Sequence, residues 1–263
     1  MEELTTDAMF DGALELAQRR RGYRFGIDAV LLGGGLGSRP GRRVLDLGAG
    51  CGVVGLTVAH LSPATEVVAV EVQPALAALA RRNASANRLE GRVRVIEADA
   101  RDVARWRGTA RSGAAVADVP EWLDLVAEGF ETVLINPPFF GATHGLRSPD
   151  GERAAARHQL FGELTELLRA GRLLANAAGT VRVIYPAERL VELLRCTAEA
   201  GLKPSRLRPI HSYADTPAEL VVLDARAAGR QELQLAPPLV LYDAPNTYTE
   251  VVRTLLRGAP IVV

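Results

Sequence analysis

The fold is decided by the stretch Val44-Leu45-Asp46-Leu47-Gly48-Ala49-Gly50-Cys51-Gly52. A short apolar run leads into three alternate glycines, and a helical pattern begins directly after them. Glycines permit a tight turn from a strand into a helix and let a ligand approach bare backbone. The stretch therefore predicts the first strand and helix of an α/β fold, with a ligand site between them.

From residue 43 onward, strand patterns alternate with helical ones. We expect strands at 43–47, 66–71, 93–97, 131–135 and 180–185, and helices at about 53–61, 74–87, 100–106, 153–176 and 187–200. This alternation is typical of a mainly parallel sheet covered on both faces. Two later runs, 205–211 and 218–225, predict a terminal antiparallel hairpin, and a short helix at 248–257 follows. We therefore predict an α/β, Rossmann-like fold with a seven-stranded sheet and helices on both faces.

The whole chain of 263 residues is expected to form one domain, 1–263. Residues 1–42 are expected to form an N-terminal segment, and the family resemblance given below implies that this segment closes over cofactor and substrate. Residues 108–129, which are alanine-rich and then acidic, interrupt the alternation as a surface insertion. Residues 237–263 form a C-terminal tail.

Composition excludes several classes of protein. Net charge is zero, which argues against a strongly basic domain. Cys51 and Cys196 lie far apart and form no C-x-x-C pair, so neither a disulfide framework nor a metal site is expected. The acidic N-terminus lacks a signal-peptide pattern, and no apolar run reaches the roughly 18 residues of a membrane span. We expect a soluble, cytoplasmic protein that does not contact the membrane.

Three acids lie at the carboxyl ends of three successive predicted strands, and together they indicate which ligand binds there. Asp46 lies one step before the glycine loop, where it would repel a diphosphate and favour an ammonium group. Counted from Gly48, the dinucleotide fingerprint G-x-G-x-x-G needs glycine at position 53, where this chain has valine, which disfavours a nicotinamide-dependent oxidoreductase. Glu71 lies about 20 residues past the loop, where an acid typically holds ribose hydroxyls, and Asp99 is placed to accept a hydrogen bond from an adenine amino group. The ligand that fits is S-adenosylmethionine.

A proline-rich motif, Asn136-Pro137-Pro138-Phe139-Phe140, ends the fourth predicted strand. Two prolines cannot continue a sheet ladder, and the residue before a proline is pushed toward extended geometry. The motif presents an amide, a carbonyl and two aromatic rings at the edge of the sheet where ligands bind. The motif is typical either of a binding site for a flat group that bears –NH2 or of a proline-terminated strand with aromatic core residues.

An arginine-rich segment precedes the first strand. From Glu15 to Arg43 there are seven arginines against two acids, a local excess of +5. This excess is typical either of a solvated basic face or of an anion-binding surface. Within it, one simple interpretation of Asp28 is a cap for a short helix over Ala29-Val30-Leu31-Leu32.

These motifs and their order resemble those of class I S-adenosylmethionine-dependent methyltransferases. The Asn136-Pro137-Pro138-Phe139 motif resembles the N-P-P-[YF] motif of the subset that methylates amino nitrogens. Within it, the chain resembles the bacterial tRNA1(Val) adenine-37 methyltransferase family. The stretches that carry the resemblance are Gly22-Tyr23-Arg24-Phe25-Gly26-Ile27-Asp28-Ala29-Val30-Leu31-Leu32, Val44–Gly52, Glu71-Val72-Gln73-Pro74 with Ala80-Arg81-Arg82-Asn83, and Asn136–Phe140.

The resemblance implies roles for individual residues. Its cofactor-binding set is Arg24, Phe25, Asp28, Asp46, Gly48, Gly50, Gly52, Glu71, Val72, Asp99, Ala100 and Asn136. Its catalytic set is Asn136, Pro137, Pro138 and Phe139, and its substrate-binding set is Phe139, Phe140 and Arg147. Arg24 would pair with the cofactor's carboxylate, Glu71 would hold the ribose, and Phe139 would stack on the target base.

The implied reaction is methyl transfer to the exocyclic amino group of adenine in RNA, at position 37 of a tRNA anticodon loop. The implied partner is tRNA, and no metal is required. Enzymes that methylate a glutamine side-chain amide in release factor or ribosomal protein, or an rRNA base, share the motif, so these substrates stay open as alternatives. A non-catalytic RNA-binding module is a further alternative, disfavoured because both motifs are intact. The sequence leaves the oligomeric state open.

Overall fold

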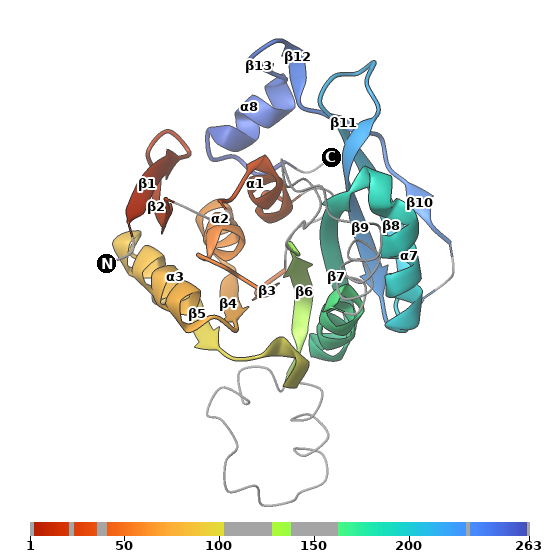
Figure 1. Ribbon diagram of the computed structural model, residues 1–263, viewed down its shortest axis with the longest axis horizontal. Helices are drawn as coiled ribbons and strands as arrows, with labels where there is room; N and C mark the ends of the chain where they lie inside the picture. The colour runs from red at the N-terminus through yellow and green to blue at the C-terminus, as the bar shows by residue number, and fades with distance from the viewer. Residues whose placement is uncertain are drawn as a thin grey trace, which may run out of the picture.

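A twisted mixed sheet forms the centre of the protein (Figure 1). The computed structural model describes residues 3–20, 24–35, 41–102, 128–137, 163–229 and 232–261. Seven principal strands lie in the order β5–β4–β3–β6–β7–β9–β8. Their bounds are β3 (Arg43–Leu47), β4 (Glu66–Glu71), β5 (Val93–Glu97), β6 (Phe130–Ile135), β7 (Ala175–Pro186), β8 (Lys203–His211) and β9 (Ala218–Arg226).

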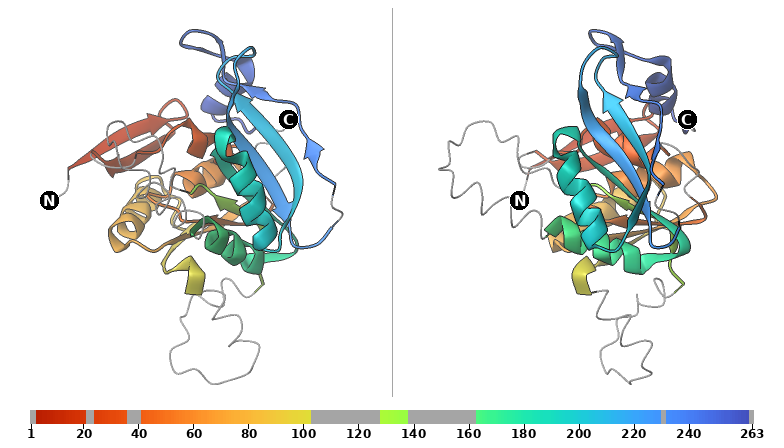
Figure 2. Two further views of the ribbon diagram at one scale, coloured as in Figure 1. Left: turned by 45° about the vertical axis from the view of Figure 1, so that its right-hand side comes forward. Right: turned by 90° about the vertical axis from the view of Figure 1, so that its right-hand side faces the viewer.

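Strand direction follows the predicted pattern. Strands β3 to β7 are mutually parallel, and β9 lies antiparallel between β7 and β8. Figure 2 shows β8 and β9 as a long pair at one side of the sheet. Two-residue strands, β10 (Gln234–Leu235) and β11 (Leu239–Val240), pair with β8 and complete nine strands in the described part of the sheet. The predicted seven-stranded sheet with a terminal antiparallel hairpin is confirmed.

Helices cover both faces of the sheet. The buried cluster on one face includes side chains of α1 (Ile27–Gly33), α2 (Val53–Leu61), α3 (Pro74–Ala86) and α8 (Glu250–Leu256). The cluster on the other face includes side chains of helical residues 163–174 and of α7 (Leu190–Glu199). Because strand side chains alternate between faces, β6 places Leu134 on the α1 side and its neighbours Val133 and Ile135 on the other.

An N-terminal hairpin, β1 (Leu4–Met9) with β2 (Leu14–Arg19), is held against α3 by two asparagines. The Asn83 amide accepts the Ala17 N–H at 2.9 Å and donates to the Ala17 carbonyl at 2.8 Å. Asn87 makes the same pair of bonds to Glu15, at 2.8 and 2.7 Å. Each amide thus bonds the edge of β2 as a neighbouring strand would. The sequence patterns did not predict this hairpin.

The structure corrects the limits of several predicted elements. The helix predicted over about 153–176 ends at residue 174, because β7 begins at Ala175. The helix predicted over 187–200 divides into a 3₁₀ turn, η2 (Ala187–Arg189), and α7. At 100–102 the described residues form a 3₁₀ turn, η1 (Ala100–Asp102). The tail adds a small hairpin, β12 (Tyr242–Ala244) with β13 (Thr247–Tyr248), before α8.

The prediction that Asp28 caps a helix is wrong. The N-cap of α1 is Gly26, and Asp28 lies inside the first turn. The insertion expected at 108–129 falls almost wholly outside the described residues, and the single-domain organisation stays a prediction. Within the described ranges, no helix is both long enough and apolar enough to cross a membrane.

A buried ion pair links β7 to β9. Arg182 and Asp224 are register partners, and the guanidinium donates to the carboxylate at 2.6 Å from Nε and at 2.9 Å from Nη2. The two side chains are only 2% and 11% exposed. Such a pair is a weak source of net stability, but removing one partner leaves a charge buried without compensation.

Asp224→Ala is therefore expected to lower the free energy of unfolding by about 3–5 kcal/mol, because Arg182 loses the carboxylate that neutralises it. Urea denaturation followed by circular dichroism measures the change. Glu250→Ala is the control, since it breaks an ion pair with Arg253 on the surface of α8 and should leave the midpoint unchanged. Equal midpoints for both variants would contradict the role of the buried pair.

Candidate active site

A pocket of about 360 Å³ opens at the carboxyl ends of the parallel strands. Ligands bind at this edge in open α/β sheets. Five of the predicted site residues line it: Gly48, Val72, Asp99, Ala100 and Pro137. The remaining lining residues are Val70, Gln73, Ala98, Arg101, Glu163, Leu164, Leu167 and Tyr185.

The glycine loop turns sharply between β3 and α2. Gly48, Gly50 and Gly52 have φ values of +79°, +57° and +89°, a region that side chains strongly disfavour. The N–H groups of Gly48 and Ala49 both donate to the Val70 carbonyl, at 2.9 and 3.0 Å. These bonds fix the loop to the end of β4, and the positive φ values explain why alternate positions require glycine.

Glu71, at the end of β4, holds the loop from the other side. Its Oε2 accepts the Gly50 N–H at 2.8 Å, and its Oε1 accepts the Gln73 N–H at 2.8 Å. The side chain is buried. A carboxylate has about four acceptor positions, so both oxygens keep capacity for hydroxyl donors.

Asp46 lies beneath the glycine loop and is 1% exposed. Its Oδ2 accepts the N–H of Gly55, in the first turn of α2, at 2.8 Å. Burial raises the pKa of the carboxyl from 3.8 to about 7, the Gly55 N–H opposes this, and the nearby Glu71 charge adds to it. The structure therefore places Asp46 as the anchor of the strand–helix turn.

Asp99 faces the pocket together with Arg101. The Arg101 Nε donates to both carboxylate oxygens at 2.9 Å, and its Nη2 makes a further hydrogen bond to Oδ2. The Arg101 hydrogen bonds hold the pKa of Asp99 below its ordinary value, so the group stays an anion and an acceptor. Arg101 also approaches Glu166, with 3.7 Å between Nη1 and Oε2.

Asn136 follows β6 on the face that carries α1. Its Nδ2 donates to Oδ2 of Asp28 at 2.8 Å, although the two residues lie 108 positions apart in the chain. Its Oδ1 is buried and has no hydrogen-bond partner among the described residues. A buried carbonyl oxygen without a donor is costly, so this atom is suited to accept a hydrogen bond from a ligand.

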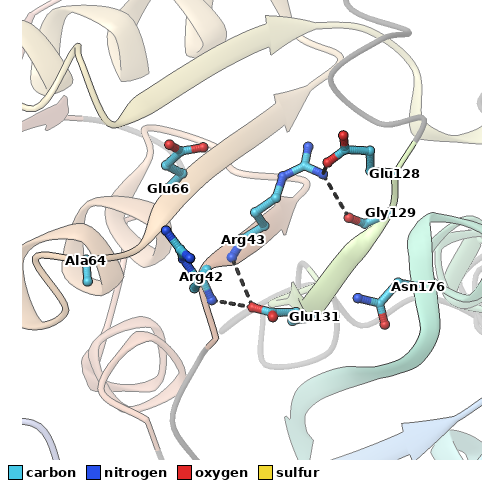
Figure 3. A pocket seen from close by; sticks show the side chains of 8 residues that line it. All are labelled: Arg42, Arg43, Ala64, Glu66, Glu128, Gly129, Glu131 and Asn176. Atoms are coloured by element: carbon cyan, nitrogen blue, oxygen red, sulfur yellow. Dashed lines mark hydrogen bonds and ion pairs between the residues drawn. The ribbon is translucent and has the colours of Figure 1, made fainter.

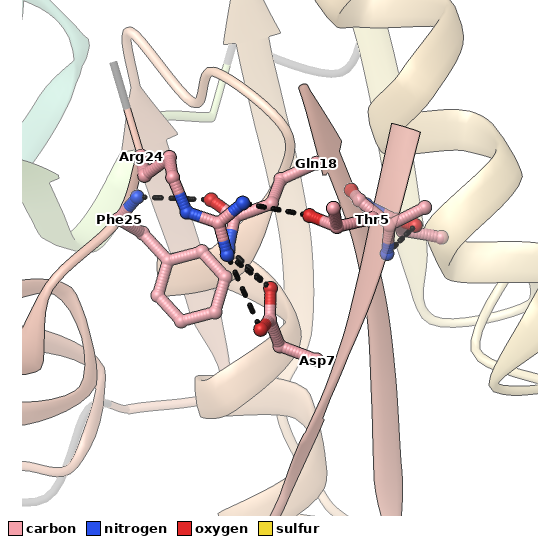
Figure 4. Close-up of polar contacts among 7 residues, drawn as sticks. Thr5, Asp7, Gln18, Arg24 and Phe25 are labelled. Atoms are coloured by element: carbon pink, nitrogen blue, oxygen red, sulfur yellow. Dashed lines mark hydrogen bonds and ion pairs between the residues drawn. The ribbon is translucent and has the colours of Figure 1, made fainter. Parts of the chain in front are cut away.

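The guanidinium of Arg24 is engaged within the N-terminal segment (Figure 4). Its Nη1 donates to the Thr5 hydroxyl at 2.7 Å, and its Nη2 donates to Asp7 at 2.9 Å. Gln18 bonds Asp7 and accepts the Phe25 N–H at 3.2 Å. The structure thus pairs Arg24 with β1, and its predicted pairing with a cofactor carboxylate stays a prediction.

Pro138, Phe139, Phe140 and Arg147 lie outside the described residues. Conversely, Tyr185 at the end of β7 and Leu164 and Leu167 line the pocket without having been predicted. The apolar strand pattern leading to Tyr185 gave one signal, because it marks the end of a neighbouring strand at the same edge.

A second pocket, also of about 360 Å³, lies at the opposite edge of the sheet (Figure 3). It surrounds the starts of β3, β4 and β6, and its charged groups bond one another. Glu131 accepts the backbone N–H groups of Arg42 and Arg43, and Arg43 donates to Glu128 at 2.9 Å. Since ligands of such sheets bind at the carboxyl edge, this pocket is not the candidate site.

Comparison with known proteins identifies the family. Residues 37–118 match the family described as TRM5/TYW2 methyltransferase domain. A tRNA1(Val) (adenine(37)-N6)-methyltransferase from Aeromonas salmonicida is 31% identical over 184 residues, covering 70% of this chain and 68% of the relative. The chain belongs to the tRNA1(Val) (adenine(37)-N6)-methyltransferase family.

Other relatives agree with that placement. The enzyme of the same name from Porphyromonas gingivalis is 27% identical over 229 residues, covering 86% of this chain and 83% of the relative. A predicted O-methyltransferase, Atu636 from Agrobacterium tumefaciens, superposes with a TM-score of 0.65 at 21% identity, covering 89% of this chain and 98% of that one. The latter supports the fold alone.

As a member of the family, the protein is an S-adenosylmethionine-dependent methyltransferase with the class I fold. The sequence predictions of family, fold class, enzyme class and cofactor are confirmed. Among the described residues, no three histidine, cysteine or carboxylate side chains come together as a metal site requires.

The buried carboxyl of Asp46 predicts a pH dependence of stability. Its folded pKa of about 7 exceeds the value of 3.8 for an exposed carboxyl, so the folded state keeps a proton that the unfolded chain releases. The contribution of Asp46 to the free energy of unfolding therefore falls as pH rises from about 4 to about 7. Asp46→Asn removes this loss and still offers an oxygen to Gly55.

Urea denaturation of the cofactor-free protein at pH 5 and pH 8 tests this. Relative to wild type, Asp46→Asn should gain stability between the two pH values, on the order of 2 kcal/mol. A difference between variant and wild type that is the same at both pH values would show that Asp46 titrates normally in the fold.

Proposed function

We propose that the protein transfers a methyl group from S-adenosylmethionine to the exocyclic amino group of adenine 37 in a tRNA. The observation that carries the proposal is the buried, unpartnered Oδ1 of Asn136, which lies beside Pro137 of the pocket. An adenine amine has two N–H donors and no useful acceptor, so it is the complement of such an oxygen. The named relatives act on the same group of adenine 37 in tRNA1(Val).

The donor chemistry of the pocket fits the cofactor. The bare backbone of the glycine loop permits close approach, and Glu71 offers two buried oxygens to ribose hydroxyls. Asp99 is held as an anion that accepts from an adenine amino group, and Val72 offers an exposed apolar surface to the ring. We assign the cofactor to this side of the site, with Ala100 beside the adenine.

S-adenosylmethionine supplies a methyl group on a positively charged sulfur. The target amine is a poor nucleophile because its lone pair is delocalised into the purine ring. Acceptance of its two hydrogens by the Asn136 oxygen and the Pro137 carbonyl would bend the nitrogen toward tetrahedral geometry and free the lone pair to bond the methyl carbon. The methyl–sulfur bond would break at the same time, leaving its electron pair on a neutral sulfur. The proton that leaves the nitrogen passes to solvent. Alignment and fixed dipoles therefore supply the catalysis.

The target base must leave its stack to reach this acceptor. Extrusion is easier from a single-stranded loop than from a duplex, which fits position 37 of an anticodon loop. We propose that Phe139 stacks on the extruded base, that Phe140 and Arg147 contact it or its backbone, and that the arginine-rich segment holds phosphates. An enzyme with this substrate acts in the cytoplasm, where tRNA is.

The substrate is tested by incubating the protein with tritiated S-adenosylmethionine and separate pools of tRNA, rRNA and release factor. Label is expected in tRNA, and nuclease digestion with mass spectrometry should place it as N6-methyladenosine at position 37. Label in release factor alone would assign the glutamine amide as substrate and overturn the tRNA proposal.

Asn136→Ala tests the acceptor. The variant should slow methyl transfer about 100- to 1,000-fold, because one preorganised dipole at the reacting nitrogen is lost. Single-turnover kinetics measure the transfer step, and calorimetry should give a cofactor Kd changed only a few-fold. Turnover close to that of wild type would refute the role of Asn136.

Glu71→Gln tests the cofactor site. A glutamine has one acceptor oxygen, so its –NH2 would face the N–H of either Gly50 or Gln73 and disturb the loop. The Kd for S-adenosylmethionine should rise about tenfold or more. Asp11→Asn, in the exposed turn between β1 and β2, is the matched control and should bind as wild type does. Unchanged affinity in Glu71→Gln would remove Glu71 from the cofactor site.

A further inference from the structure

We propose that Asp28 is a positioning residue that orients the amide of Asn136, so that its oxygen and not its nitrogen meets the target amine. The proposal rests on the proposed function, because it concerns the same acceptor. It assigns Asp28 a role toward the substrate amine through Asn136, distinct from the cofactor contact that the family resemblance implied.

The geometry of the pair carries this inference. The Nδ2 of Asn136 donates to the Asp28 Oδ2 at 2.8 Å. The opposite end of the same amide, Oδ1, is buried with no donor in the part of the chain that the structure describes. Asp28 is 9% exposed, so the bond is shielded from competing water. One end of the amide is held, and the acceptor oxygen at the other end is unused by the described residues.

The chemical difference between a carboxylate and an amide explains why an acid stands at position 28. The two ends of an asparagine amide have nearly the same shape, and only their hydrogen-bond partners distinguish them. An ionised carboxylate accepts and never donates, so it can hold only the –NH2 end. A flipped Asn136 would bring its own –NH2 against the –NH2 of adenine, and neither group could accept.

The position of Asp28 is itself restrained by the packing of α1. A Cβ on Gly26 would lie 2.5 Å from the Asp28 Oδ1, so the carboxylate lies directly against bare backbone. At the other end of the helix, a Cβ on Gly33 would lie 2.8 Å from Thr57, which shows how closely α1 approaches α2. Asp28 therefore lies on α1, which packs against α2, the helix that follows the glycine loop.

An exchange of the two side chains tests the proposal. Asp28→Asn alone provides both a donor and an acceptor, so the Asn136 amide is no longer held in one orientation. Asn136→Asp alone places two carboxylates against each other. The double variant, Asp28→Asn with Asn136→Asp, restores one hydrogen bond with the donor on residue 28 and leaves a carboxylate oxygen open at position 136.

Asn136→Asp should lower kcat for tRNA methylation about 100-fold and Asp28→Asn about two- to tenfold, and the double variant should recover most of the Asn136→Asp loss. The Kd for S-adenosylmethionine, measured by calorimetry, should stay within about threefold of wild type in all three. In the cofactor-free protein, the urea midpoint should fall in Asn136→Asp and return toward wild type in the double variant. That readout does not depend on activity.

The kcat values and the cofactor affinities of the variants decide the matter. Recovery of kcat in the double variant at constant cofactor affinity supports the positioning role, and a double variant that folds as wild type does but recovers no kcat contradicts it. An Asp28→Asn variant with wild-type kcat overturns it, and so does one whose only defect is weaker cofactor binding. If Asn136→Ala is itself active, the proposed function fails first. An inactive Asn136→Ala beside a fully active Asp28→Asn overturns this inference alone.

Discussion

The carboxylate of Asp46 and the N–H of Gly55, 2.8 Å apart, join the first parallel strand to the helix that follows it. Burying this acid is costly, which is the reason its pKa rises, but the first turn of a helix offers an N–H and a favourable dipole to a carboxylate. The bond closes the turn in which the three glycines adopt positive φ. The bare backbone offered to the cofactor, and the contact of Glu71 with Gly50, depend on the position of that loop.

The alternation of side chains between the two faces of the sheet places Asn136 on the same face as Asp46. Asp46 in β3 and Asn136 after β6 both lie on the face that carries α1 and α2, because Val44 and Leu134, two residues before each, belong to the buried cluster of that face. Each of these side chains is hydrogen-bonded to one helix: Asp46 to Gly55 of α2, and Asn136 to Asp28 of α1. The glycine loop proposed to bind the methyl donor and the proposed amine acceptor therefore share one packed support, as a reaction governed by alignment requires.

Much of this arrangement could be predicted because its signals are local. Buried parallel strands appear as continuous apolar runs, and polar residues at their carboxyl ends mark one edge of the sheet. The partner of Asn136 could not be predicted in this way. Asp28 precedes an apolar helix, where an acid is ordinarily a cap, and its contact spans 108 residues. The hairpin on α3 escaped prediction for a related reason, since Asn83 and Asn87 bond backbone atoms that carry no sequence signal.

The C-terminal tail also contributes to the site through α1. A Cβ on Gly34 would lie 2.5 Å from Leu255, so α8 packs directly on the end of α1, and the Ile261 N–H donates to the Gly34 carbonyl at 3.3 Å. Both Val252 and Leu255 are fully buried in the same cluster as the α1 side chains. Three distant parts of the chain thus meet at one helix: the N-terminal segment forms it, β6 ends against its first turn, and the tail packs on its last. Because a displacement of about 1 Å is enough to slow an alignment-dependent reaction severely, the role proposed for Asn136 would depend on the tail as well as on the sheet.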